Sequence, residues 1–275
     1  MRCSRLFQLA SLTLALTALT ALPAQAIVGG TPTTAFGQVA GGVLIAPNWV
    51  LTARHLNYPV GSTYSNGYGS STVAAFYSAG SGDYPFADLM LLRLDTAITA
   101  PGISLNATAL GDGTGYNFDA TIVTGANQVP RGYAFTTVRE FQTMVDPDGD
   151  DPLPAVMANF LVTYPLGYGA PYVEGGDSGG GLFLGHVTDA TTPLWGITSA
   201  QIYDEDEQGN PINFASGFVQ VANYRSWIDA TMQADLADSE MASWVVTSVP
   251  EPGTVALWAL GLTLLSARAA RKRAR

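Results

Sequence analysis

The feature that most constrains the fold is a series of short apolar segments, each bounded by clusters of Gly, Pro, Asn and Asp. Examples of these segments are residues 42–45, 49–52, 89–92, 181–184 and 195–199. Strands have this length and are bounded by such turn residues, whereas Gly and Pro destabilise the interior of a helix. With 30 Gly and 16 Pro among 275 residues, the sequence predicts an all-β protein.

Both ends of the chain read as targeting segments rather than as parts of the fold. Residues 1–26 contain two arginines, an apolar stretch and the motif A-Q-A at 24–26, which is the plan of a secretory signal peptide. Residues 249–275 begin with V-P-E-P, continue with an apolar run and end in five basic residues that act as a stop-transfer signal. The body is therefore 27–248, and we expect it outside the cytoplasm, with transient membrane association through the tail.

The body of the chain is strongly acidic. It holds 21 of the 22 acidic residues but only five of the 12 basic ones, a formal net charge of −16. Nucleic acid is disfavoured as a partner, because binding it requires cations that neutralise phosphates. The single cysteine, Cys3, lies in the signal segment. The body therefore folds without disulfide bonds, although an exported compartment would permit them.

One amphipathic helix is expected near the end of the body. Apolar residues recur there at spacings of three and four, the period of one helix face, at Tyr224, Trp227, Ile228, Met232 and Leu236. The following segment, Glu240–Ser248, is interpreted as a spacer to the tail.

An acidic loop carries carboxylates at alternate positions, Asp146, Asp148 and Asp150. Oxygen ligands of this kind bind Ca²⁺, but Met157 stands where the calcium loop of an EF-hand places its last glutamate. Calcium binding and a solvated turn therefore both remain open here. No other cofactor and no other metal is expected.

Two histidines and one serine are candidates for chemistry. A histidine is the usual general base near neutral pH, and the chain has only His55 and His186. His55 follows the strand-like run 49–52, whereas His186 lies in a context typical of a surface loop. Ser178 is surrounded by five glycines within 175–181. Glycine allows positive φ and close backbone approach, so N–H groups can converge on a developing oxyanion. A flexible glycine loop would have the same composition.

Several motifs then occur in one characteristic order. They are I-V-G-G at 27–30, G-G-V-L-I at 41–45 with L-T-A-R-H at 51–55, A-D-L-M-L-L at 87–92, G-D-S-G-G at 176–180 and W-G-I-T-S at 195–199. In this order, and followed by the expected helix, they resemble the trypsin/chymotrypsin family of serine proteases over nearly the whole body. The resemblance implies two six-stranded antiparallel β-barrels, divided near 125–145, with the active site between them.

The resemblance also implies the roles of the catalytic residues. His55 would be the general base, Asp88 the carboxylate that orients it, and Ser178 the nucleophile that forms an acyl-enzyme intermediate. The N–H groups of Gly176 and Ser178 would form the oxyanion hole.

Activation is implied by the same likeness. Cleavage by signal peptidase after residue 26 would expose the α-amino group of Ile27, and this group would insert beside Asp177. The I-V-G-G motif directly follows the expected cleavage site, so signal removal itself would activate the enzyme.

The substrate pocket is implied less sharply. Tyr172 would form the base of the primary pocket, with Ser199, Gln201 and Ser216 around it. Tyr172 offers no charge to a buried substrate cation, so we expect small or apolar side chains rather than Arg or Lys. The chain departs from the family at Arg54, where Ala is usual, and at Gln201, where Gly is usual; whether either side chain obstructs the substrate stays open here.

The tail resembles the PEP-CTERM sorting signal of Gram-negative bacteria. This implies processing by an exosortase near 250–252 and delivery to the cell surface or the extracellular matrix. The expected function is thus that of an exported serine endopeptidase. The alternative is a catalytically impaired trypsin-fold binding or scaffold protein at the cell surface. Acidic residues alone, without a spacing signal, are little support for a glycosidase.

Overall fold

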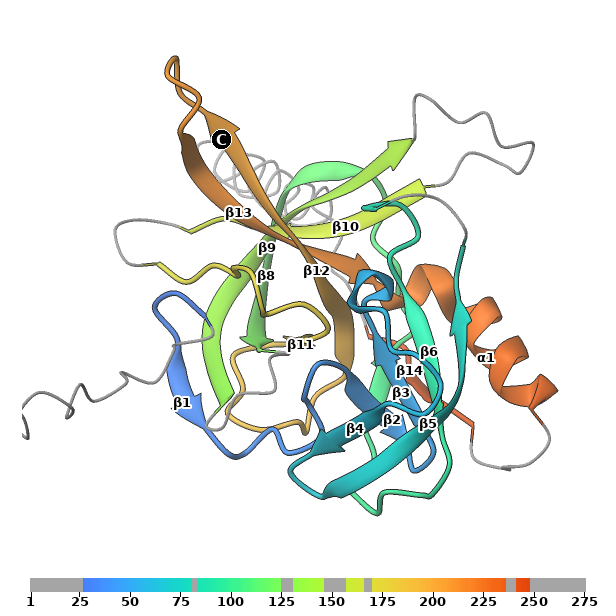
Figure 1. Ribbon diagram of the computed structural model, residues 1–275. Helices are drawn as coiled ribbons and strands as arrows, with labels where there is room; N and C mark the ends of the chain where they lie inside the picture. Colours follow the sequence, from blue (N-terminus) through green and yellow to red (C-terminus); the bar gives the residue numbers. More distant parts are fainter. Residues whose placement is uncertain are drawn as a thin grey trace, which may run out of the picture.

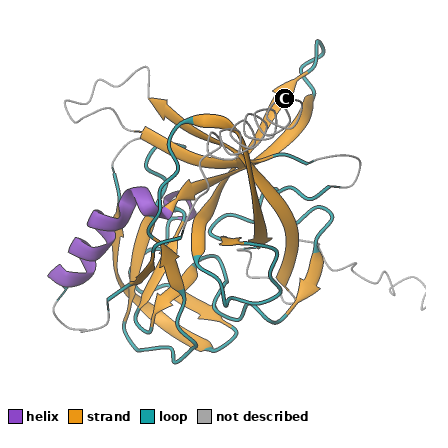
Figure 2. Ribbon diagram, turned by 180° about the vertical axis from the view of Figure 1, so that it is seen from behind, coloured by secondary structure: helices purple, strands orange, loops and turns teal. Residues whose placement is uncertain are grey.

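The computed structural model describes residues 27–80, 84–124, 131–145, 157–165, 170–235 and 241–247, and the following statements concern these residues. They form two β-sheets and one α-helix (Figures 1 and 2). None of the helices in these ranges has the length and hydropathy to cross a membrane. The predicted signal segment and sorting tail lie outside the described residues.

The first sheet has five antiparallel strands. Their spatial order is β2 (Val43–Ala46), β3 (Trp49–Thr52), β6 (Met90–Leu94), β5 (Gly69–Ser78) and β4 (Thr63–Asn66). Strands β3 and β6 are almost fully buried, which explains why they read as continuous apolar runs rather than as alternating patterns.

The second sheet has nine strands, six of which close into a ring. The ring follows the order β11 (Gly181–Leu184), β8 (Gly113–Val123), β9 (Arg131–Val145), β10 (Met157–Thr163), β13 (Pro211–Gln220) and β12 (Leu194–Glu205), and β12 pairs again with β11. Outside the ring, β1 (Thr31–Thr33) pairs with β9, while β7 (Ser104–Asn106) pairs with β12 and with β14 (Ser243–Val245).

The prediction of an all-β fold with one C-terminal helix is confirmed in its coarser form, since the described residues are mostly β and include one α-helix. The prediction of two closed six-stranded antiparallel barrels needs correction. The ring is closed, but the first sheet is open, because its edge strands β2 and β4 do not pair. The Tyr64 hydroxyl on β4 instead lies 3.1 Å from the carbonyl oxygen of Gln38 and 3.2 Å from that of Gly42, just before β2. A side chain thus links the two edges where a barrel would have a ladder. In addition, β7 pairs in parallel on both sides.

The division between the sheets also differs from the expected one. After β1, which belongs to the second sheet, the chain forms the first sheet, leaves it after Leu94 and returns to the second sheet at Ser104. The interval 125–145, expected as the division, instead contains β9, which is a member of the ring.

One buried apolar cluster extends across both sheets. Trp49 and Leu51 of the first sheet belong to it, as do Phe183 of the ring and Ile228 and Met232 of the helix. Burying one large apolar side chain contributes about 1.5–3 kcal/mol, so this core can hold the sheets together in a body that has no cysteine.

The predicted helix is present. A 3₁₀ turn, Val221–Tyr224, leads directly into α1 (Arg225–Ala234), which lies beside the first sheet (Figures 1 and 2). Ile228 and Met232 are its buried residues, as the spacing predicts. Leu236, which was expected to extend the apolar face, lies outside the described residues.

The segment interpreted as a spacer, Glu240–Ser248, is instead partly docked. Its residues Ser243–Val245 form β14 beside β7. Trp244 Nε1 donates a hydrogen bond to Asp229 Oδ1 on α1 at 2.8 Å. A strand of three residues carries no readable periodicity, so the sequence alone did not indicate it.

Candidate active site

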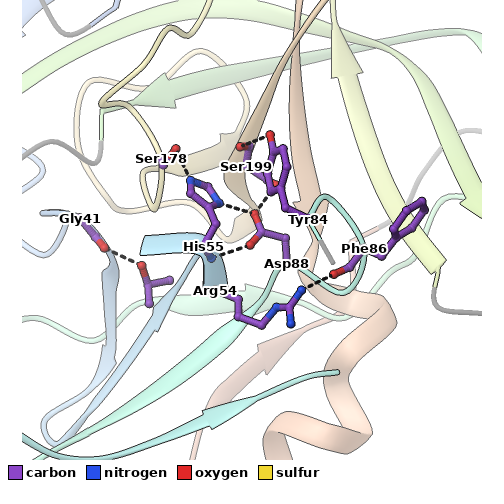
Figure 3. Close-up of polar contacts among 9 residues, drawn as sticks. Gly41, Arg54, His55, Tyr84, Phe86, Asp88, Ser178 and Ser199 are labelled. Carbon is purple, nitrogen blue, oxygen red and sulfur yellow. Dashed lines mark hydrogen bonds and ion pairs between the residues drawn. The ribbon is translucent and has the colours of Figure 1, made fainter. Parts of the chain in front are cut away.

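Three side chains that lie far apart in the sequence form a continuous hydrogen-bonded chain between the two sheets (Figure 3). His55 Nδ1 is 2.8 Å from Asp88 Oδ2, and His55 Nε2 is 2.8 Å from Ser178 Oγ. An ionised carboxylate can only accept hydrogen bonds, so Nδ1 carries the proton in the neutral imidazole. The lone pair of Nε2 then faces the Ser178 hydroxyl, which is the arrangement a general base requires.

Strand register brings His55 and Asp88 together. Thr52 on β3 pairs with Met90 on β6 in an antiparallel ladder. Residues that follow Thr52 and residues that precede Met90 therefore continue side by side beyond the end of the ladder. His55 lies in the 3₁₀ turn Arg54–Leu56 at this end, and its main-chain N–H donates to Asp88 Oδ1 at 2.9 Å.

The Asp88 carboxylate is buried and fully hydrogen-bonded. Its side chain is 0% exposed, against 28% for His55. Besides the two hydrogen bonds from His55, Oδ2 accepts one from Ser199 Oγ at 2.5 Å. Such bonds offset the cost of burying a charge, so this site can keep an anion beside an imidazolium. Ser199 was expected in the substrate pocket, but the structure places its hydroxyl on Asp88.

The loop that carries Ser178 depends on glycine. Gly176 and Gly179 have φ values of +107° and +79°, which residues with a side chain rarely adopt. A Cβ on Gly179 would lie 2.5 Å from the carbonyl oxygen of Gly41, so the backbones approach too closely for any other residue. Within the described part of the chain, the N–H groups of Gly176 and Ser178 donate no hydrogen bond. Both donors are thus available to an incoming group.

Asp177, next to the serine, is buried with one oxygen unpartnered. Oδ2 accepts a hydrogen bond from the N–H of Glu174 at 2.9 Å, whereas Oδ1 is buried and has no partner among the described residues. Burial raises the pKa of Asp177 to about 7. Ile27, the expected partner of Asp177, is 0% exposed, and the N–H of Val28 donates to the carbonyl of Tyr172 at 3.2 Å, five residues before Asp177 in the chain.

The other three residues expected around the pocket have different surroundings from Ser199. Ser216 is fully buried, and its Oγ accepts a hydrogen bond from the Val173 N–H at 2.9 Å, so it presents no free hydroxyl. Gln201 Nε2 donates to the Val173 carbonyl at 3.1 Å. Tyr172 is half-buried and stacks on Phe214, with ring centroids 5.0 Å apart and planes inclined by 6°. Phe214, which sequence reasoning missed, gives this region an aromatic surface.

The sequence left open whether the Arg54 side chain crowds the substrate. In the structure it donates to the carbonyl of Phe86 at 3.1 Å (Figure 3). It also donates to the carbonyl of Gly80 at 3.4 Å. Between Phe86 and Asp88, Ala87 has a φ of +42°, an unfavourable value for a residue with a Cβ. Arg54 thus holds both ends of the segment that leads to Asp88.

Tyr84 contacts two parts of the site and was not identified from the sequence. Its ring meets the His55 ring edge-on, with centroids 5.1 Å apart and an interplanar angle of 76°. Its hydroxyl donates to the Ser199 carbonyl at 3.2 Å (Figure 3). Burial, and then the nearby charge of Asp88, raise the pKa of the Tyr84 hydroxyl. The sequence contains no signal for this residue, because both contacts arise from tertiary structure.

The second histidine does not take part in this geometry. His186 lies just after β11 and contacts β9: its Nε2 is 3.0 Å from the Thr136 carbonyl oxygen, and its imidazole stacks on Phe135. Asp146, Asp148 and Asp150 lie outside the described residues. Within those residues, no group of three or more His, Cys, Asp or Glu side chains could hold a metal ion.

Comparisons with known proteins identify the family. The model of the trypsin family matches residues 20–228, and that of the PEP-CTERM protein-sorting motif matches residues 248–273. No curated protein matches the chain. Among solved structures, HBP at atomic resolution and a mutant of human heparin binding protein (CAP37) are each similar at 19% identity and a TM-score of 0.49, covering 75% of this chain and 96% of theirs. Since the trypsin match spans most of the chain, the protein belongs to the trypsin family and carries a C-terminal PEP-CTERM sorting motif.

Proposed function

We propose that the protein is an exported serine endopeptidase. The observation that supports this most directly is the hydrogen-bonded chain Asp88–His55–Ser178. In the first step, Ser178 Oγ attacks the scissile carbonyl carbon while His55 Nε2 takes its proton, and buried Asp88 stabilises the imidazolium. His55 then returns the proton to the leaving amine. In the second step, His55 takes a proton from a water molecule whose oxygen attacks the acyl carbon. His55 then returns this proton to Ser178 Oγ, and the carboxylic acid product leaves.

The negative charge that develops on the carbonyl oxygen needs donors beside Ser178. The N–H groups of Gly176 and Ser178, which donate to no described residue, are proposed to supply them. Removing one such donor typically costs about 3 kcal/mol of transition-state stabilisation. The glycine conformations around Ser178 would therefore serve catalysis as well as close packing.

Activation by N-terminal processing is proposed to complete the site. Asp177 Oδ1 is buried without a partner among the described residues. Ile27 is buried as well, and the next residue, Val28, forms a bridge with Tyr172. Cleavage before Ile27 would create an ammonium group, which a buried carboxylate requires for stability. The partnered Asp177 would then hold the adjacent loop in its active form.

The substrate preference is proposed to be small or apolar. The face formed by Tyr172 and Phe214 is aromatic, and neither ring can neutralise the charge of an arginine or lysine side chain. The PEP-CTERM motif implies sorting to the cell surface in Gram-negative bacteria by an exosortase, so protein or peptide substrates would be met there.

Active-site labelling separates this proposal from a non-catalytic binding protein. A fluorophosphonate probe should label the processed wild-type protein at Ser178 and leave the Ser178→Ala variant unlabelled. Peptide mapping would locate the adduct. Correctly processed wild-type protein that takes up no probe would overturn the proposal and favour the scaffold function.

A further inference from the structure

We propose that Tyr84 competes with the substrate: in the free enzyme its hydroxyl occupies the Ser199 carbonyl, the main-chain acceptor that a peptide substrate needs beside Ser178. The inference rests on the proposed peptidase function and goes beyond it, since it identifies a residue that sets the affinity for peptides.

The position of the Ser199 carbonyl follows from the pairing of β12. On one side, Ser199 falls in a bulge between Thr198 and Ala200 and has no partner on β13. On the other side, Thr198 exchanges two main-chain hydrogen bonds with Gly179 and Gly180, at 2.9 and 2.8 Å. These glycines directly follow Ser178. The Ser199 carbonyl is therefore the next acceptor along β12 past the nucleophile loop.

An extended peptide would use this acceptor. Peptides commonly bind by adding a strand to a free sheet edge, where main-chain hydrogen bonds provide the affinity. A peptide whose scissile carbonyl lies at Ser178 runs past the point where β12 stops pairing with β11. Its first main-chain N–H on the side before the cleaved bond would donate to the Ser199 carbonyl.

Tyr84 already occupies that acceptor. Its hydroxyl donates to the Ser199 carbonyl at 3.2 Å, and its ring contacts the His55 imidazole (Figure 3). A carbonyl oxygen can accept two hydrogen bonds, but the Tyr84 side chain extends from the His55 ring to this oxygen, so we infer that it lies where the N–H of a peptide would approach. The hydroxyl holds the side chain through this hydrogen bond, and Tyr84 is 51% exposed, so other parts of the protein do not enclose the ring. Peptide binding therefore breaks the Tyr84–Ser199 hydrogen bond.

The Tyr84→Phe variant isolates this hydrogen bond, because it removes the hydroxyl and keeps the ring. One intramolecular hydrogen bond corresponds to about a 2- to 10-fold change in an equilibrium constant. With tetra-alanine p-nitroanilide as substrate, we expect the KM of the processed variant to fall by about this factor, with kcat unchanged. With p-nitrophenyl acetate, which has no N–H to donate, we expect no change. A peptide KM that is unchanged or raised would overturn the proposal.

A matched control removes the hydroxyl of a tyrosine on the first sheet. Tyr77 lies on β5, and its hydroxyl donates to Asp235 Oδ2 at 3.0 Å rather than to the Ser199 carbonyl. Tyr77→Phe should leave both kinetic constants unchanged. An equal fall in the peptide KM in this variant would show that the effect is not specific to Tyr84.

A binding measurement keeps this proposal separate from the proposed catalysis. In the Ser178→Ala background nothing is cleaved, and NMR titration gives the dissociation constant of tetra-alanine p-nitroanilide directly. Adding Tyr84→Phe should lower that constant by about 2- to 10-fold. An unchanged constant overturns the role of Tyr84, whereas failure of the wild-type protein to label with fluorophosphonate overturns only the catalytic function.

Discussion

The two sheets contribute to the site in different ways. The first sheet positions His55 and Asp88 through the regular ladder between β3 and β6, so their contact follows from strand register. The ring contributes Ser178 from a loop in which two glycines take positive φ values. The same loop contains buried Asp177, whose Oδ1 has no hydrogen-bond partner among the described residues. The comparison teaches that the contact between His55 and Asp88 is built into the sheet, whereas the loop of Ser178 depends on glycine. Under the proposed activation, this loop would also depend on a charge that N-terminal processing supplies.

The largest effect is expected from removing one reactive side chain, either from the ring or from the first sheet. Ser178→Ala and His55→Ala should each lower kcat by about 10⁴- to 10⁶-fold, because the members of a triad act as a unit. Both side chains lie in the site rather than in the core, so the melting temperature should barely change. Peptide hydrolysis and thermal unfolding of the processed protein check this. Near-native turnover in His55→Ala would show that another group is the base.

A second prediction addresses the nucleophile loop alone. One extra residue before Ile27 would keep an α-amino group from reaching Asp177, and the donors at Gly176 and Ser178 would lose their support. We expect a loss of about 10²- to 10³-fold in kcat, comparable to the loss of an oxyanion donor. N-terminal sequencing should show that the active secreted form begins at Ile27. Full activity in the extended form would contradict the proposed activation.

The stability of the extended form should depend on pH through Asp177. Its pKa is raised from 3.8 to about 7 in the folded chain, so between these values the folded state holds a proton that the unfolded state has lost. Folding stability therefore falls as pH rises from about 4 to about 7, by a few kcal/mol at most. Urea unfolding of the extended form and of its Asp177→Asn variant measures this as the difference between two curves. Parallel curves would contradict it, and processing at Ile27 should flatten the slope.

The smallest effect is expected from removing the hydrogen bond between Ser199 of the ring and Asp88 of the first sheet. Ser199→Ala removes one of the hydrogen bonds to the Asp88 carboxylate, and bonds to charged groups contribute about 1.5–3 kcal/mol. We expect kcat to fall by about tenfold, far less than for the triad members, because His55 still holds Asp88 through two hydrogen bonds. The variant Ser216→Ala, whose hydroxyl contacts Val173 instead, serves as the control. A loss as large as that of His55→Ala would show that Ser199 is itself indispensable.

Local patterns were sufficient to predict much of this protein. Short apolar runs between turn residues predicted a β protein, and the spacing of Ile228 and Met232 predicted the helix. The glycines around Ser178 marked a loop with unusual backbone angles, because only glycine adopts them at low cost. The residues that meet at the site, His55, Asp88 and Ser178, could be identified from motifs, although their catalytic roles stay a prediction.

The sequence by itself thus determined which residue types stand where backbone angles or chemistry demand them. Tertiary structure alone decided which of them touch. The Ser199–Asp88 hydrogen bond joins residues 111 positions apart, and the Tyr84–Ser199 bond joins residues 115 positions apart. The same holds for the open first sheet and for β14, whose three residues pair only because β7 offers an edge. Such contacts depend on strand register and on the packing of one sheet against the other, and no local pattern encodes either of them.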